Sequence, residues 1–445
     1  MRKFPFLVTV AAALLCSCSD GDDSGSTDYS TSSIEATQFV PIQLGIQNSN
    51  SVFVRGTGTV GDTVGSAKNV WQAQRLKVYM LHKDSIALAK DSNGLGKDIY
   101  NNVEFYAPGM TSTDPTHGTG GDGLMTGISD GDSIIRPLND SVKYYPLNGN
   151  FDFYGYRTDG ADTAAVNFSA DDKITVGFKI DGTQDIMVAK AVPSATDIAK
   201  LGAGSARFFS SYAARRGVHP NLKFRHLLTR LSFNVIPCGP KTVDTQTYIV
   251  VDSIRLIAKD TKGTLTIAKD GDVEGNSQVI DWEGSTLATG DTLSLMQRDT
   301  ANHATNYLDS CQLVQLDTVA LKDSVYWADI PDNTAIEGTN TNKLDSATVH
   351  IGEAMLLAPA NEYKMIMYVR QKLPVTYSEG ATTAAWQYNK LESTIKFNSE
   401  SSSGFQAGKT YDVKAKIYSI EEIIITASLT GWQQGEDVNI DTEDE

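Results

Sequence analysis

The sequence has few basic residues for its length. Its 445 residues include 38 Lys and Arg but 54 Asp and Glu, which gives a formal net charge of −16. Nucleic acid and anionic lipid each require a basic face on the protein that binds them. The charge therefore excludes nucleic acid as a partner and argues against peripheral binding to anionic lipid. An acidic surface mainly keeps a protein soluble, so it names no partner by itself.

A long apolar run is also missing. Met1–Lys3 is basic and Phe4–Leu15 is apolar but too short to cross a bilayer, which is the form of an export signal over residues 1–17. The residues that follow resemble a lipobox, because Leu15 lies three positions before Cys18 and the small Ser17 lies directly before it. We therefore expect a lipid on Cys18 as the only membrane anchor. An ordinary cleaved signal with incidental cysteines is the alternative.

Cysteine is scarce, with four residues in the chain. If Cys18 is lipidated, the exported body retains Cys238 and Cys311. Two cysteines cannot form a dense disulfide framework, and their spacing does not match a zinc motif. A single disulfide and two buried thiols both fit the sequence.

Motifs for catalysis and cofactor binding are missing as well. None of the six histidines has a metal-ligand spacing, and no nucleophile elbow, phosphate loop or dinucleotide fingerprint is present. His226 lies on an apolar strand, where a packed histidine is the better interpretation. The acidic loops Gly127–Ser133 and Ala268–Gly275 are interpreted as turns rather than calcium sites. We expect no enzyme activity and no cofactor.

A polar, acidic segment follows the export signal. Residues 18–37 are rich in Asp, Ser and Gly, which predicts a flexible tether behind the lipid. Phe39–Ile46 then has a strand-like pattern, although Pro41 within it suits an edge strand better than a central one. Arg55 and Gly56 follow in a Gly-rich stretch that we expect to be exposed.

Period-two alternation between turn signals recurs along the rest of the chain and predicts an all-β fold. The strand-like runs are Gln74–Leu81, Phe151–Arg157, Ile174–Ile180, Asp185–Val192, Arg230–Ile236, Glu362–Gln371, Thr410–Tyr418 and Ile420–Trp432. Asp252–Asp272 is predicted to be a hairpin with Asp260–Gly263 as its turn, and a short helix is predicted over Ser194–Leu201. The pattern lapses over Gly202–Asn221, so we divide the chain into β-sandwich domains at 56–215 and 216–445.

One short motif recurs, in which Asp precedes Ser or Thr and a small or aliphatic residue follows. It resembles the acceptor sequence for periplasmic O-glycosylation in Gram-negative anaerobes, although a chain rich in these residues also yields such triplets by chance. The acceptor positions are Thr63, Ser85, Ser133, Ser141, Thr163, Ser253, Thr292, Thr300, Thr318, Ser324 and Ser346.

Several motifs together resemble the fimbrillins, the lipoprotein-derived pilins of Gram-negative anaerobes. They are the lipobox at Cys18, the VRGTGTV, FDFYGYR and KFRHLLTRLSFNV stretches, and GKTYDVKAKIYSIEEIIITASLTGWQQGED near the C-terminus. Each motif alone is weak. Their order and spacing over almost the whole chain make the resemblance more specific.

The resemblance implies two β-sandwich domains of transthyretin-like character that assemble by strand exchange with other fimbrial subunits. It implies a precursor that reaches the cell outer membrane as a surface lipoprotein. An arginine-specific protease then cuts between Arg55 and Gly56 and releases segment 38–55. The apolar residues of the removable strand are Phe39, Val40, Ile42, Leu44 and Ile46. Candidates for the donated strand are Ile423, Ile424, Ile425, Trp432, Val438 and Ile440.

Two alternatives to a stalk or tip subunit stay open. The first is a fimbrial anchor that keeps its lipid and is not cleaved. The second is a surface glycan-binding β-sandwich lipoprotein, for which a cluster of exposed Trp is expected, whereas the five Trp residues here are scattered along the chain. The sequence identifies no adhesion ligand.

Overall fold

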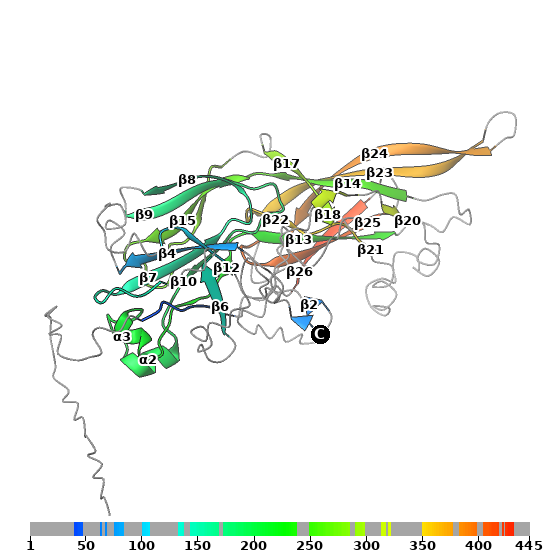
Figure 1. The fold of residues 1–445 in the computed structure, drawn as a ribbon. Coiled ribbons are helices and arrows are strands. Elements are labelled where there is room, and N and C mark those ends of the chain that lie inside the picture. The colour runs from blue at the N-terminus through cyan, green and yellow to red at the C-terminus, as the bar shows by residue number, and fades with distance from the viewer. Residues whose placement is uncertain are drawn as a thin grey trace, which may run out of the picture. The chain divides into compact units, whose positions relative to one another are not determined.

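The computed structural model describes residues 40–47, 63–64, 67–68, 75–83, 100–106, 132–137, 143–168, 172–237, 249–284, 290–298, 313–316, 319–321, 349–376, 382–397, 404–417, 421 and 423–430. Most of these residues lie in strands (Figure 1). The predicted all-β fold is confirmed.

The first strands form an eight-stranded sheet in the order β11–β1–β6–β5–β4–β7–β10–β12. The bounds are β1 Leu44–Gln47, β4 Arg75–His82, β5 Val103–Tyr106, β6 Asp132–Pro137, β7 Phe151–Arg157, β10 Met187–Lys190, β11 Asn221–Leu222 and β12 Arg225–His226. An isolated bridge between Ala191 and Leu222 brings the end strand β11 against the chain that follows β10. The sheet therefore curls around an apolar cluster that its own side chains share with residues outside it, such as Phe208, Phe209 and Val218.

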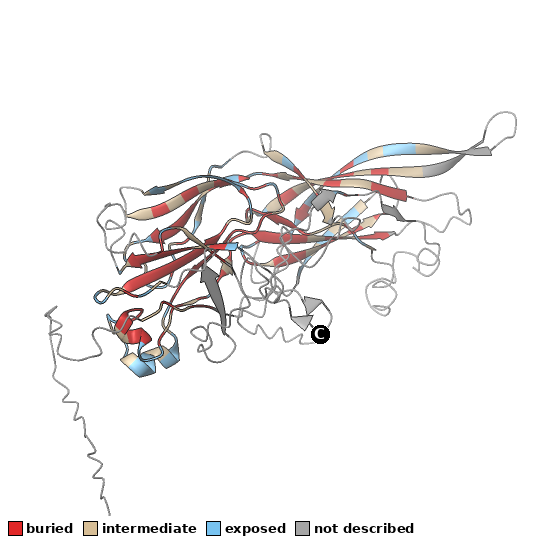
Figure 2. Cartoon of the chain, in the orientation of Figure 1, coloured by how far each residue is buried: buried red, intermediate tan, exposed pale blue. Residues whose placement is uncertain are grey.

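A four-stranded sheet, in the order β16–β15–β9–β8, packs against the other face of the first sheet. Its strands are β8 Asp162–Phe168, β9 Lys173–Lys179, β15 Lys262–Lys269 and β16 Ile280–Trp282. The strand β7 has an apolar cluster on each side, because Phe151 and Phe153 face the inner cluster while Tyr154 and Tyr156 face the cluster between the sheets. It is buried along its whole length (Figure 2), whereas the alternation predicted a half-buried strand.

The remaining long strands form a second sandwich. One sheet contains β13 Thr229–Pro237, β21 Val349–His350, β22 Met355–Leu357, β25 Thr410–Ile417 and β26 Ile423–Thr430. The other contains β14 Ile249–Ala258, β17 Asp291–Ser294, β20 Val319–Leu321, β23 Glu362–Thr376 and β24 Thr382–Lys396. Inward side chains from both sheets, such as Phe233 and Val413 from one and Leu256 and Met365 from the other, form a shared core. Two short pairs complete the strands, β2 Thr63–Val64 with β3 Ala67–Lys68 and β18 Met296–Arg298 with β19 Leu313–Gln315.

Two short helices lie in the segment between the strand series. Helix α2 spans Ala195–Leu201 and begins with a capping box, in which the Ser194 hydroxyl accepts the Asp197 amide and the Asp197 carboxylate accepts the Ser194 amide. The predicted helix is thereby confirmed, with Gly202 as its C-cap. Helix α3 spans Ser211–Ala214 and is capped by Ser210.

The predicted hairpin around Asp260–Gly263 is wrong in its pairing. The strands β14 and β15 lie where expected, but they pair with different sheets. β14 pairs with β17, β20 and β23 of the second sandwich, whereas β15 pairs with β9 and β16 of the four-stranded sheet. The pairing of β15 with β9 also joins segments on both sides of the predicted boundary at 215/216, and the division into two folding domains stays a prediction.

Candidate functional site

The first strand, β1, is held on both edges. It pairs antiparallel with β6, where Leu44 lies opposite Ile135, and parallel with β11, where Gly45 lies opposite Asn221. The Gly45 amide donates to the Pro220 carbonyl at 2.9 Å. β1 is therefore an interior strand of its sheet rather than an edge strand.

The residues just before β1 have a third partner. The Ile42 amide donates to the Lys143 carbonyl at 2.8 Å, and the Tyr145 amide donates to the Val40 carbonyl at 2.9 Å. Pro41 lies in the isolated bridge between these two hydrogen bonds, before the continuous strand begins. Proline has no backbone N–H, but at this position its absence interrupts no ladder of strand hydrogen bonds. Pro41 is therefore compatible with a segment that leads into a central strand. The paired strand begins at Leu44, later than the predicted start at Phe39, which lies outside the described residues.

Two side chains anchor this segment in the inner core. Ile42 and Leu44 are 5% and 2% exposed and belong to the cluster that also contains Tyr145 and Phe151. Burial of an Ile or Leu side chain contributes about 1.5–3 kcal/mol each. Of the other predicted strand residues, Val40 packs against the same cluster and Ile46 pairs with Leu222.

Removal of residues 40–47 would leave a defined slot. The backbone groups of Lys143, Tyr145 and Pro220 would lose their partners, as would the facing edges of β6 and β11. The apolar space that Ile42 and Leu44 occupy would open at the same time. An incoming extended segment can restore both the hydrogen-bond ladder and the burial, which is the physical basis of strand addition.

Sequence reasoning located β1 but missed the walls of the slot. The strand β11 has only two residues and follows a stretch rich in Gly, Ala, Ser and Arg, where no alternation is visible. The cue that could have indicated it is Leu222 between polar Asn221 and Lys223. Leu222 is fully buried in the same cluster as Leu44.

The candidate donor residues divide into two groups. Ile423, Ile424 and Ile425 lie in β26, the edge strand of its sheet, which pairs antiparallel with β25 along its whole length. Ile423 and Ile425 pack against the core of the second sandwich, and Ile424 is 44% exposed. Trp432, Val438 and Ile440 lie outside the described residues, so the identity of the donated strand stays a prediction.

Other predicted sites lie outside the described residues. They are the lipidated Cys18, the cut between Arg55 and Gly56, the pair Cys238 and Cys311, and the acceptor positions Ser85, Ser141, Thr300, Thr318, Ser324 and Ser346. Among the remaining acceptor positions, Thr163 and Thr292 are exposed, Ser253 is half-buried, and Thr63 and Ser133 lie in β2 and β6. Glycosylation at these positions stays a prediction.

His226 is packed, as its apolar surroundings predict. Its side chain is 6% exposed, and Nδ1 lies 2.8 Å from Oδ2 of the buried Asp185. The loop Ala268–Gly275 contains a turn built on Asp272, whose carboxylate accepts the amides of Gly275, Asn276 and Ser277 at 2.9, 3.0 and 3.1 Å. Both carboxylate oxygens therefore stabilise the loop, in agreement with a turn.

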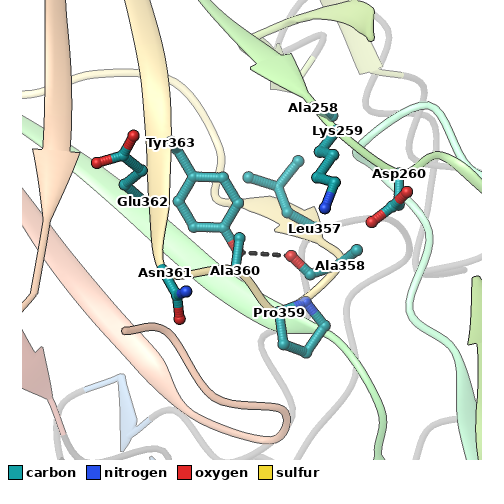
Figure 3. A pocket seen from close by; sticks show the side chains of 10 residues that line it. All are labelled: Ala258, Lys259, Asp260, Leu357, Ala358, Pro359, Ala360, Asn361, Glu362 and Tyr363. Atoms are coloured by element: carbon teal, nitrogen blue, oxygen red, sulfur yellow. Dashed lines mark hydrogen bonds between the residues drawn. The ribbon is translucent and has the colours of Figure 1, made fainter. Parts of the chain in front are cut away.

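A cavity of about 520 Å³ lies between the loop after β14 and the loop before β23 (Figure 3). Lys259 and Asp260 lie at one side of it, and Asn361 and Glu362 lie at the other. The Tyr363 hydroxyl donates to the Ala358 carbonyl at 2.7 Å, and burial raises the pKa of this phenol. Glu362 lies 3.2 Å from Lys396. These groups already serve the structure, and they form no arrangement of nucleophile and base.

Among the described residues, no three His, Cys, Asp or Glu side chains are close enough together to hold a metal ion. Within the same ranges, no helix is long and apolar enough to cross a membrane.

No protein-family model and no curated protein matches the chain. Among solved structures, it is similar to a fimbrial protein from Bacteroides vulgatus, with 11% identity over 88% of this chain and 100% of the other and a TM-score of 0.42. It is also similar to the fimbrial anchor protein Mfa2 from Porphyromonas gingivalis, with 9% identity over 88% of this chain and 98% of the other and a TM-score of 0.30.

Proposed function

We propose that this protein is a structural subunit of a surface fimbrium, in the stalk or at the tip, and that it polymerises when an incoming strand replaces β1. The precursor is an outer-membrane lipoprotein, anchored through Cys18, on the outer face of the cell. An arginine-specific protease cuts it after Arg55, and the released segment carries β1 away. The role is structural and supports adhesion, with no catalysis.

The observation that carries this proposal is the way in which β1 is bound. Residues 40–47 contribute two buried side chains and pair with three other segments, so they complete the inner core and sheet. Arg55 lies eight positions after Gln47, so a cut there would separate all of β1 from the rest of the fold. The intact precursor keeps its slot filled, which prevents premature polymerisation.

The test is to incubate the purified precursor with an arginine-specific protease and follow the products on a gel. We expect a shortened subunit and a ladder of oligomers. Arg55→Ala should keep the fold and abolish both the cut and the ladder. Arg75→Ala, at an exposed arginine of β4, is the matched control and should still form the ladder.

The same experiment separates the alternatives. Cleavage at Arg55 without any oligomer would contradict a stalk role. A mature surface form that retains both the Cys18 lipid and β1 would identify an anchor instead. A glycan-binding role requires a cluster of exposed Trp. The described Trp residues contact other side chains instead. The Trp282 ring packs edge-on against the Phe178 ring, with 5.7 Å between the ring centres, and the Arg370 guanidinium lies 4.7 Å from the centre of the Trp386 ring.

A further inference from the structure

The segment with α2 and α3 carries four exposed basic residues, which we call the basic patch: Lys200, Arg207, Arg215 and Arg216. The guanidinium of Arg216 lies 3.5 Å from the centre of the Tyr212 ring and that of Arg207 lies 4.7 Å from it. Two cations are therefore held on one aromatic ring.

Lys200 belongs to the same surface. Its Nζ donates to the carbonyl of Gly217 at 2.8 Å, directly after Arg216. Between residues 195 and 217 the only acid is Asp197, whose carboxylate caps α2. Within this stretch basic residues therefore outnumber acids, whereas the chain as a whole has a net charge of −16.

The basic patch leads directly into one wall of the β1 slot. Four residues after Arg216, the Pro220 carbonyl accepts the Gly45 amide, and Asn221 and Leu222 then pair with β1. Four residues span at most about 14 Å. The electrostatic screening length is about 8 Å at physiological salt. Charges on a segment that lies beside β11 are therefore within one to two screening lengths of the patch.

The chain itself contains a segment with the complementary chemistry. Residues 435–445 contain six acids, Glu436, Asp437, Asp441, Glu443, Asp444 and Glu445, and no Lys or Arg. Between these acids lie Val438 and Ile440, two positions apart, which is the spacing of Ile42 and Leu44 in the strand that fills the slot. Side chains two positions apart share one face of a strand.

We propose that the basic patch is a docking surface for residues 435–445 of a second copy of this chain. Opposite charges draw the acidic segment to the patch and raise the rate of encounter beside the slot. The inference rests on the proposed function in one respect, because it takes the β1 slot as the place that a second copy enters. The patch contact itself requires neither cleavage nor removal of β1.

The test uses the uncleaved protein and a fluorescent peptide of residues 431–445, with binding measured by anisotropy at low and at physiological salt. We expect Arg215→Glu with Arg216→Glu to weaken binding at least about tenfold and to flatten its salt dependence. The double variant Lys259→Glu with Lys269→Glu removes two exposed cations elsewhere and should bind like the wild type. If the reversed arginines impair folding, Arg215→Gln with Arg216→Gln replaces them.

Three results would overturn the proposal. They are no binding of the peptide to the wild type, equal loss in the arginine and lysine variants, and undiminished binding of a peptide whose acids are replaced by amides. Patch-dependent binding to vesicles with anionic lipid, without binding of the peptide, would identify a membrane surface as the occupant instead. The ladder assay on the cleaved precursor does not depend on these outcomes, so failure here leaves the proposed function to be judged separately.

Discussion

Gly155 shows how a single residue supports the wall of the β1 slot. It lies in β7 between β4 and β10, and a Cβ atom there would lie 2.7 Å from Phe224 Cζ and 3.1 Å from Leu222 Cδ1. We expect Gly155→Ala to lower the free energy of unfolding by about 1–3 kcal/mol, because the added methyl group overpacks the core beside β11. Urea unfolding measures the change.

The matched control is Gly177→Ala in β9. There the nearest atom to an added Cβ is Ala164 Cβ at 3.5 Å, an ordinary contact. Alanine restricts the unfolded chain more than glycine does, so this variant should be neutral or more stable by up to about 1 kcal/mol. Equal losses in the two variants would show that the contact with Leu222 and Phe224 is not the cause.

His219 makes the stability of the fold depend on pH. Burial, and next the positive charge of Lys200, lower the pKa of His219 from 6.5, while Asp197 opposes the shift. Burial lowers the pKa of His82 in the same direction. Below about pH 6.5 the unfolded chain binds protons that the folded chain does not, so stability is lost as the pH falls toward the lowered pKa values.

The measurement is the free energy of unfolding at about pH 7.5 and about pH 5.5, in the wild type and in His219→Gln. The wild type should lose stability at the lower pH, and the variant should lose less of it. At the higher pH, the difference in free energy of unfolding between the two proteins gives the effect of replacing the neutral imidazole ring. This difference serves as the control. An identical loss in both proteins would assign the pH dependence to other groups.

At the scale of elements, the release of β1 should limit assembly. Leu44 is 2% exposed in the inner core, so Leu44→Ala should weaken the docking of this strand by about 2–5 kcal/mol. After cleavage, β1 should leave sooner, and we expect oligomers to appear earlier on a gel than for the wild type. Leu256→Ala removes a fully buried leucine from the core of the second sandwich, a different cluster from that of β1, and should leave the time course unchanged. Slower assembly of the Leu44 variant would contradict replacement of β1 as the limiting step.

The strands themselves could be predicted from sequence, but their partners could not. The apolar run from Phe39 to Ile46 is a local signal, and the strand β1, Leu44–Gln47, lies at its end. Asp260–Gly263 looks like a hairpin turn by the same logic, yet a turn sequence reports only that the chain changes direction. Which sheet each flanking strand joins depends on distant residues, since β14 pairs with β23 while β15 pairs with β9. The wall strand β11 is too short to produce any periodic signal.

At the scale of the molecule, the pairing of β15 with β9 ties the two strand series together. The cluster between the first two sheets contains Val176 from β9 and also Leu265 and Ile267 from β15. Leu356 from β22 belongs to the same cluster. The first sandwich therefore takes part of its core from residues beyond the predicted boundary, and a chain cut at 215/216 lacks them.

We accordingly predict that residues 39–215 do not fold alone. Without β15, the inner edge of β9 and the apolar side chains facing Leu265 would be exposed, and β1 would lack β11, its parallel partner. The fragment should show no cooperative unfolding transition by circular dichroism, whereas the full chain should show one. Co-expression with residues 216–445 is the control, because it supplies the missing strands and should restore a transition in the complex. A sigmoidal transition in the isolated fragment would mean that the strands before residue 215 suffice for a core, and that the two series are joined by contact rather than by shared folding.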